Sequence, residues 1–145
     1  MNTIDAKRLL VFWILLLGVV LLRATAIGND ASDAMAMLEG KVFVGHTGPL
    51  NGPVNGEDEV VFRNSRFLST ACDKWGFDSA GYTATVQPDG IHFTSVTKSP
   101  KHGQIFWKGV VSGDIINATY LWTKERWYWF DAREERWFKG KLRAE

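Results

Sequence analysis

The chain has 145 residues, of which 46% are hydrophobic, and its formal net charge is +1. This length predicts one folded domain, and the seven Trp and nine Phe predict an aromatic core or pocket. Residues 1–26 hold three basic residues and one acidic residue, so fourteen basic and fifteen acidic residues remain. That balance argues against a nucleic-acid partner, which needs a clustered basic surface.

The first 26 residues have the pattern of an export signal. Lys7 and Arg8 precede the apolar run Leu9–Leu22, and Ala24-Thr25-Ala26 has the small-x-small form of a cleavage site. The run is shorter than the roughly 20 apolar residues of a full transmembrane span, so a cleaved signal peptide and an uncleaved signal anchor both stay open. Either way we expect the domain to be exported, as a periplasmic or secreted protein or anchored outside the cytoplasmic membrane.

Residues 27–37 are small, acidic and rich in Ala, and they are predicted to form a spacer with at most one weak helical turn. The domain proper, residues 38–145, shows the two-residue period of half-buried strands. Its predicted strands are 39–45, 57–63, 66–71, 81–87, 91–97, 103–111, 115–123 and 136–143.

The connections between these strands are also predicted from the sequence. Short turns are expected at Asn64-Ser65, Pro88-Asp89-Gly90 and Ser112-Gly113-Asp114. A surface loop rich in Gly and Pro is expected at 46–56, and an irregular lid or corner at 72–80. The aromatic run 127–130 is predicted to continue or follow the seventh strand, with a turn at 131–135.

Consecutive antiparallel strands of this number predict an all-β fold, an up-and-down barrel of about eight strands after an N-terminal hydrophobic helix. Closure removes the sheet edges and buries one face of every strand. An open sandwich is the alternative.

Some segments carry a family resemblance. Leu38–Phe43 (LEGKVF) occupies the place where lipocalins carry Gly-x-Trp, and Arg136 or Arg143 lies in the last strand, where that family has a closing arginine. With the eight-strand meander, the chain resembles the lipocalin and calycin superfamily. The phrases FLSTACDKWGF and GQIFWKGVVSGDIINATYLW also resemble small exported bacterial proteins. The resemblance implies a barrel and no particular ligand.

The interior of an eight-stranded barrel is either filled by side chains or holds one small ligand. Alternation directs seven aromatic residues inward, and these are the candidate ligand-binding residues: Phe67, Tyr82, Phe93, Trp107, Tyr120, Trp122 and Phe138. Gly109 and Ala118 lie between the tryptophans of one hairpin and would leave room beside them. A packed core is the alternative for the same residues.

Trp127-Tyr128-Trp129-Phe130 is the most unusual run of the sequence. In a strand, alternation would place Trp127 and Trp129 on one side and Tyr128 and Phe130 on the other, so that one pair is exposed; packing of both faces, against the loop at 75–77, is the alternative. Trp127 and Trp129, if exposed, would form one surface patch with Trp75, suited to a carbohydrate, a partner or a membrane interface.

Cys72 is the only cysteine, which excludes an intramolecular disulfide and a zinc site made only of thiolates. It is the candidate reactive thiol, although a buried, inert side chain is the simpler expectation. Neither Cys72 nor Ser69 has a histidine at a spacing typical of catalysis, so we predict no catalytic residue, and the scattered histidines predict no metal or other cofactor.

Three functional hypotheses result. The first is a non-enzymatic exported barrel that binds a small apolar or amphipathic molecule in its aromatic interior. The second is a cell-envelope interaction module with a packed core that acts through surface aromatics. The third, the weakest, is an enzyme that uses Cys72 or a carboxylate–histidine pair.

Overall fold

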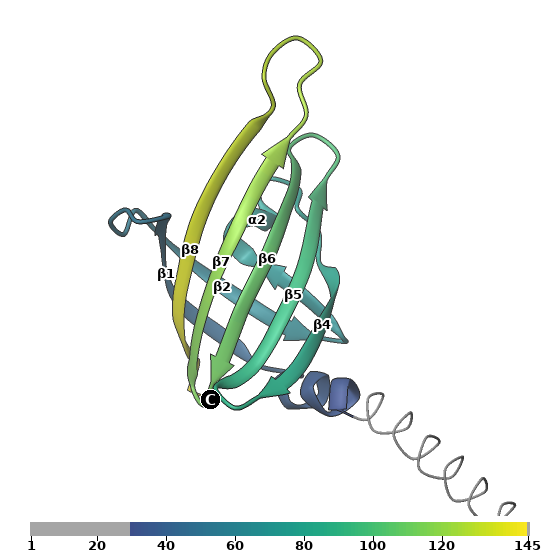
Figure 1. Ribbon diagram of the computed structural model, residues 1–145, viewed down its shortest axis with the longest axis vertical. Coiled ribbons are helices and arrows are strands. Elements are labelled where there is room, and N and C mark those ends of the chain that lie inside the picture. Colours follow the sequence, from purple (N-terminus) through teal and green to yellow (C-terminus); the bar gives the residue numbers. More distant parts are fainter. Residues whose placement is uncertain (1–29, 145) are drawn as a thin grey trace, which may run out of the picture.

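The computed structural model describes residues 30–144, and Figure 1 shows that they form a barrel with an N-terminal helix, residues 30–38, at one end. The strands follow one another around the barrel and close it, in the order β1 to β8. Their bounds are Val42–Pro49 (β1), Gly56–Arg63 (β2), Arg66–Ser69 (β3), Ala80–Gln87 (β4), Gly90–Ser99 (β5), Gly103–Ser112 (β6), Ile115–Lys124 (β7) and Ala132–Leu142 (β8). The predicted antiparallel up-and-down barrel is confirmed.

Closure depends on a close approach between the first strand and the last. β1 pairs with β8 along its length, and Gly45 faces Gly140 in this register. A Cβ atom at Gly45 would lie 2.0 Å from the carbonyl oxygen of Lys139 and 2.5 Å from the Cα of Gly140. Only glycine fits at this position, because any side chain would push the two strands apart.

The predicted short turns have the backbone that a tight hairpin requires. Asn64 and Ser65 have φ of 55° and 57°, the positive values needed at both central positions of a type I′ turn. Gly113 has φ of 57° in the β6–β7 turn. Such turns match the right-handed twist of the flanking strands, so they set the register of these hairpins.

Alternating chain direction gives the barrel two distinct ends. The short turns β2–β3, β4–β5 and β6–β7 lie at the helix end, together with residues 30–38. The connections β1–β2, β3–β4, β5–β6 and β7–β8 lie at the opposite end, which we call the aromatic end. The β7–β8 loop, residues 125–131, projects farthest from it (Figure 1).

The N-terminal helix is longer than predicted and is not a free spacer. Ala34 and Leu38 are fully buried against the barrel core. Behind the helix, the Gly40 N–H donates to the Phe62 carbonyl at 2.8 Å, and the Glu39 carboxylate accepts the N–H groups of Asn64 and Ser65. These bonds fix the helix over the β2–β3 turn, where it closes the helix end of the core.

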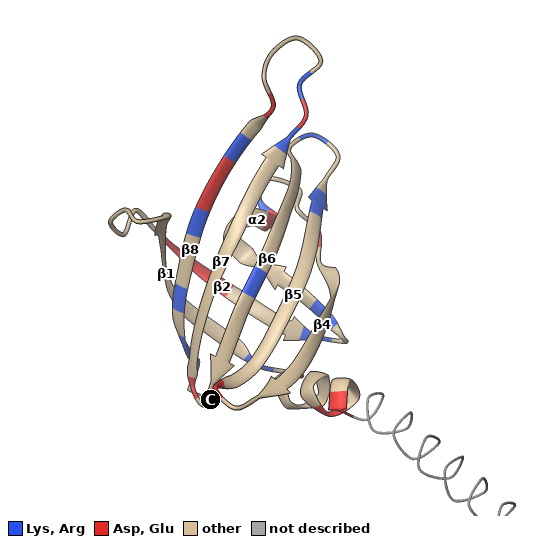
Figure 2. Cartoon of the chain, viewed as in Figure 1, with Lys and Arg blue, Asp and Glu red and all other residues tan. Residues whose placement is uncertain are grey.

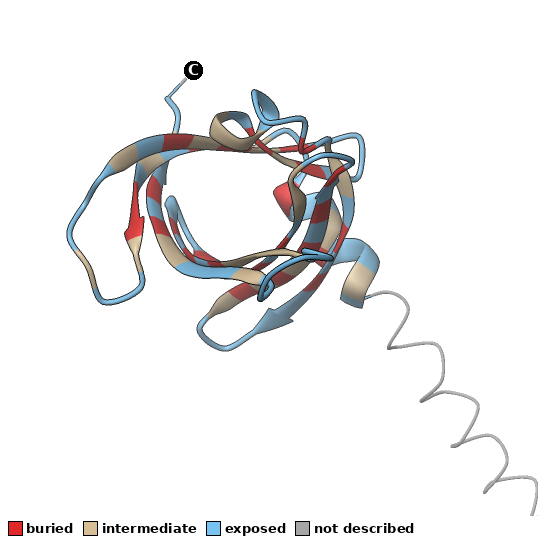
Figure 3. Ribbon diagram, turned by 90° about the horizontal axis from the view of Figure 1, so that it is seen from above, coloured by how far each residue is buried: buried red, intermediate tan, exposed pale blue. Residues whose placement is uncertain are grey.

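The interior divides into an apolar half and a more polar half. Toward the helix end it is filled by Leu38, Phe43, Phe62, Ile91, Phe93, Ile116 and Phe138. Toward the aromatic end the buried side chains include Thr47, Asp58, Ser69, Thr97 and Ser99. Figure 3 looks along the barrel and shows buried and exposed residues alternating around its ring of strands.

Three local predictions were wrong. β1 continues through residues 46–49, where Thr47 and Gly48 are buried, so the predicted loop at 46–56 is shorter. The short helix α2, Thr70–Asp73, replaces the end of the predicted third strand, and the Ser69 hydroxyl caps it by accepting the N–H of Cys72. β8 begins at Ala132, inside the predicted turn at 131–135, and residues 127–130 follow the seventh strand as part of a loop, which was one of the two alternatives for them.

Candidate functional site

The seven aromatic residues predicted to line the interior mostly contact other rings. Six of them are buried: Phe67, Tyr82, Phe93, Trp107, Tyr120 and Phe138. Phe67 lies 5.1 Å from Trp107 between ring centroids, and Trp107 stacks on Tyr120 at 4.2 Å. Trp122 is only partly buried, and its indole N–H donates to the His102 carbonyl.

Phe43 and Phe62, which were not among the predicted interior site residues, complete this cluster. The Phe62 ring lies within 5.0–6.2 Å of Phe43, Phe67, Tyr82 and Phe93, in edge-on arrangements. The space predicted beside Gly109 is also occupied, because a Cβ there would lie 2.6 Å from the Phe93 ring. Alternation along 43–45 and 58–62 was the available signal for both residues.

A buried carboxylate organises the polar half of the interior. Asp58 is 6% exposed and accepts hydrogen bonds from the Ser69 hydroxyl at 2.6 Å, the Glu59 N–H at 2.7 Å and the Ala71 N–H at 2.9 Å. Burial raises the pKa of Asp58 above its usual value, and these hydrogen bonds oppose the rise. The carboxylate therefore ties β2 and β3 to helix α2.

Cys72, the predicted reactive thiol, lies on α2 and packs against the core. Burial raises the pKa of its thiol, which disfavours the nucleophilic thiolate. The structure pairs Cys72 with no histidine: His92 contacts Asp89 at 2.7 Å, and His102 packs edge-on against Trp75. Within residues 30–144, no three His, Cys, Asp or Glu side chains gather as a metal site.

A hydrogen-bonded chain closes the barrel at its aromatic end. The Arg136 Nε–H donates to the Tyr120 hydroxyl at 2.9 Å, and that hydroxyl lies 2.7 Å from Thr47 Oγ1. Arg136 also pairs with Glu134 at 2.8 Å. Of the two arginines considered for a closing role, Arg136 joins β7 to β8 inside the barrel mouth, whereas Arg143 pairs with Glu59.

Two buried polar atoms of the interior have no hydrogen-bond partner in the protein. They are Thr97 Oγ1 and the indole Nε1 of Trp107, on residues that are 1% and 0% exposed. A buried donor without an acceptor costs about 1–3 kcal/mol. Both lie on neighbouring strands, β5 and β6, and face inward.

The aromatic run 127–130 forms the tip of the β7–β8 loop. Trp127 is 95% exposed, Tyr128 68%, Trp129 70% and Phe130 85%. The Arg126 N–H donates to the Asp131 carboxylate at 3.1 Å and closes the loop at its base. The prediction that alternation would bury one pair is wrong, because a tip outside the sheet has no inner face.

Trp75, the third residue of the predicted patch, is 55% exposed and lies at the same end of the barrel. Its ring packs edge-on against the His102 ring, with 5.6 Å between the ring centroids. The structure therefore exposes all three tryptophans, with Trp127 and Trp129 on the β7–β8 loop and Trp75 on the connection between β3 and β4.

Charges around the loop nearly balance. Residues 124–135 contain three basic side chains and four acidic ones: Lys124, Arg126 and Arg133, and Glu125, Asp131, Glu134 and Glu135. Figure 2 shows the resulting alternation of blue and red on the loop base and the upper part of β8. Arg133 pairs with Glu135 at 2.9 Å, so these charges partly neutralise each other.

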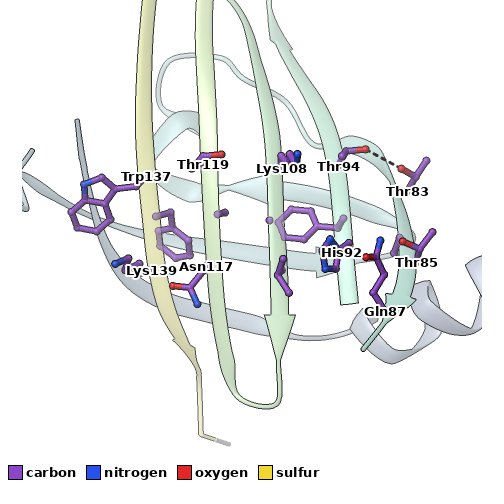
Figure 4. Close-up of a pocket in the computed structure, with 16 residues that line it drawn as sticks. Thr83, Thr85, Gln87, His92, Thr94, Lys108, Asn117, Thr119, Trp137 and Lys139 are labelled. Carbon is purple, nitrogen blue, oxygen red and sulfur yellow. Dashed lines mark hydrogen bonds between the residues drawn. The ribbon is translucent and has the colours of Figure 1, made fainter. Parts of the chain in front are cut away.

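A groove lies on the outer wall of the barrel and was not predicted from the sequence. It has a volume of ≈ 550 Å³ and extends across β4 to β8 (Figure 4). Two cross-strand rows of side chains border it. The first, the Lys108 row, consists of Thr83, Thr94, Lys108, Thr119 and Trp137. The second, the Asn117 row, consists of Thr85, His92, Val110, Asn117 and Lys139.

The floor of the groove lies between these two rows, where Gly109 and Ala118 face each other across β6 and β7. Sequence alternation marked the groove's polar residues only as outward-facing, and its existence depends on which residues the register brings side by side.

No protein-family model, curated protein or solved structure gives a match to the chain. The barrel assignment therefore depends on the topology alone, and membership of the lipocalin and calycin superfamily stays a prediction. None of the helices in residues 30–144 combines the length and the hydrophobicity needed to cross a bilayer.

Proposed function

We propose that this protein is an exported docking module that attaches to a lipid–water interface through the loop 125–131. The observation that supports this proposal is the exposure of four consecutive aromatic side chains, 68–95% each, at the tip of the loop. Single exposed apolar residues are normal on a protein surface, but a contiguous group of this kind marks an interaction site.

The shape of the loop favours lipid over a flat protein surface. All four rings are exposed at once, in two edge-on pairs, Trp127 with Tyr128 and Trp129 with Phe130, on a tip that projects from the barrel. A flat partner would cover one or two of them, whereas a fluid interface surrounds the whole tip. Trp and Tyr also concentrate at the boundary between headgroups and acyl chains.

Energetics and charge agree with this partner. Burying one Phe-sized side chain gains about 1.5–3 kcal/mol, so two inserted rings suffice for measurable binding. The nearly balanced charges at the base of the loop give little attraction to anionic lipid. We therefore propose that binding depends on apolar insertion and is largely insensitive to salt.

The position of the loop bears on how the chain is exported. Residue 30 lies at the helix end and the tip at the opposite end, so a retained N-terminal anchor would point the tip away from its own membrane. The proposal therefore requires that the signal is cleaved after Ala24-Thr25-Ala26 and that the domain is released. The mass of the protein recovered from its host would show whether these residues are removed.

The test measures binding of the protein to phosphatidylcholine vesicles. It uses residues 30–144, which contain all eight strands and the whole described core. We expect the protein to sediment with vesicles and its Trp emission to shift to the blue. The double variant Trp127→Ala/Phe130→Ala should weaken partitioning at least tenfold. Phe106→Ala is the matched control, because that ring is 43% exposed on the barrel wall.

Three results would contradict the proposal. They are unchanged partitioning of the double variant, equal weakening by Phe106→Ala, and binding that disappears in 0.5 M salt, the last of which would indicate electrostatic attachment. Both variants should keep the melting temperature of the parent protein, because the changed rings are exposed.

A second candidate function has its own observation. The unpartnered Trp107 Nε1 and Thr97 Oγ1 favour a small amphipathic molecule inside the barrel, with its acceptor atom on these donors. Native mass spectrometry of protein purified from its own host would detect such a molecule. Trp107→Phe keeps a ring but removes the N–H donor, and should lower the fraction of protein with bound ligand. If the mass of the unaltered protein equals that of its polypeptide chain alone, this candidate is contradicted.

A further inference from the structure

We propose that the groove on the outer wall of β4 to β8 binds an acidic oligosaccharide. This site is separate from the aromatic loop, because its residues lie on the barrel wall and include none from 125–131. The polar side chains of the groove come from β4, β5, β6, β7 and β8, and Figure 4 shows how they lie along it.

The charge of the groove selects an anionic ligand. Lys108 and Lys139 line it, and no acidic residue is among the residues that form its surface. The Lys139 ammonium lies 5.7 Å from the centre of the Trp137 ring, a cation–π contact that holds this charge beside the groove. Carboxylates of a ligand would meet both ammonium groups.

The neutral side chains between the two lysines fit a ligand with many hydroxyl groups. Thr119 is the cross-strand neighbour of Lys108, and Asn117 is the neighbour of Lys139. Their hydroxyl and amide groups donate and accept, as sugar hydroxyls do. Gly109 and Ala118 lie on the floor between the rows and add no outward side chain to it, which leaves room for a sugar ring between the polar groups.

The dimensions fit an extended chain and not a single small anion. Five adjacent strands, about 4.8 Å apart, give each row a length of about 19 Å. Trp137 ends the Lys108 row, where its indole N–H donates to the Gly52 carbonyl at 3.1 Å and fixes the ring. A chain of several sugar rings would lie along the rows, across the strands.

The same geometry disfavours an acidic peptide. Peptides commonly bind sheets by adding a strand to a free edge, through main-chain hydrogen bonds. β5, β6 and β7 are each paired on both sides within a closed barrel, so the groove offers no free main-chain groups. Recognition must come from side chains, as the groove's hydroxyl, amide and ammonium groups provide.

The test measures the affinity of residues 30–144 for oligogalacturonate, alginate and hyaluronate oligosaccharides by isothermal titration calorimetry. We expect at least one of these acidic chains to bind, and to bind more weakly as salt increases. Lys108→Ala and Lys139→Ala should each reduce that affinity about tenfold. Lys141→Ala is the matched control, because Lys141 lies on the same strand outside the groove.

A second variant tests the site by its shape. Thr119→Tyr would fill the groove between Lys108 and Trp137 while keeping a residue suited to a strand, and should abolish binding. Circular dichroism and a thermal melt would show that each variant is folded. Trp127→Ala/Phe130→Ala should leave oligosaccharide affinity unchanged, so failure of this proposal is distinguishable from failure of the lipid proposal.

Several results would overturn the inference. They are no binding of any of the three acidic oligosaccharides, equal affinity for uncharged maltotetraose, and equal weakening by Lys141→Ala. Binding of only phosphatidylglycerol vesicles or inorganic phosphate would also overturn it, because it would assign the two lysines to lipid headgroups or to a free anion.

Discussion

Asp58 joins three segments of the chain inside the barrel. Its carboxylate accepts hydrogen bonds from Ser69, Glu59 and Ala71, and so connects β2, β3 and the start of α2. Burial nevertheless raises its pKa above 3.8 in the folded protein. The folded state therefore holds the proton more tightly than the unfolded state, and this group's contribution to stability is largest below pH 3.8 and is lost as pH rises through the raised pKa.

Asp58→Asn should remove this pH dependence. The amide oxygen keeps the two backbone N–H bonds and the amide nitrogen faces the Ser69 hydroxyl, so the network has the same shape without a titrating group. We expect the free energy of unfolding in urea, measured between pH 3.5 and 7, to decline less with rising pH than in the parent. Asp58→Ala is the comparison, and should lose about 1–3 kcal/mol at pH 7 by leaving buried donors unpaired. Parallel pH profiles of the parent and Asp58→Asn would contradict this account.

The N-terminal helix stabilises the barrel through one side of its surface. Leu38 is fully buried, whereas its neighbour Met37 is 54% exposed. Leu38→Ala should therefore lower the free energy of unfolding by about 2–5 kcal/mol, because it opens a cavity at the helix end. Met37→Ala should change it by less than about 0.5 kcal/mol. Denaturant titration of both variants checks this, and equal effects would mean that the helix does not seal the core.

Elements of the fold differ in how far their sequence predicts them. The β6–β7 hairpin was predicted with its turn and inward residues, because alternation and a glycine turn are local signals. The N-terminal helix was not predicted at its full length. It is stabilised by the packing of Ala34 and Leu38 against the barrel core, and this tertiary contact leaves no signal in the short Ala-rich segment. For residues 127–130 the sequence left open whether they continue or follow the seventh strand, because aromatic residues favour strands only where a sheet accepts them.

Barrel closure is a property of the whole molecule and depends on Gly45. Gly45→Val would place a side chain where the Lys139 carbonyl lies 2.0 Å from the Cβ position. We expect it to separate β1 from β8, to cost about 3 kcal/mol or more, and to expose two strand edges that promote association. Size-exclusion chromatography and thermal unfolding would show both effects.

Gly81→Ala is the control for this change. Nothing lies within 4 Å of a Cβ at Gly81, and its φ is not positive. Alanine there should be neutral or stabilise the protein by up to about 1 kcal/mol, because it restricts the unfolded chain. A monomeric Gly45→Val variant with the parent's melting temperature would show that closure tolerates a side chain at this position.

The sequence by itself determined the all-β class, the number and order of strands and the inward-facing side of most of them, because these follow from a period of two and from local turn chemistry. Only the tertiary structure decided what each face does. It packed Phe62 and Phe67 against their neighbours, brought Lys108, Thr119 and Trp137 into one row, and left residues 127–130 outside the sheet. These outcomes depend on cross-strand register and closure, which join residues far apart in the chain and which no local pattern contains.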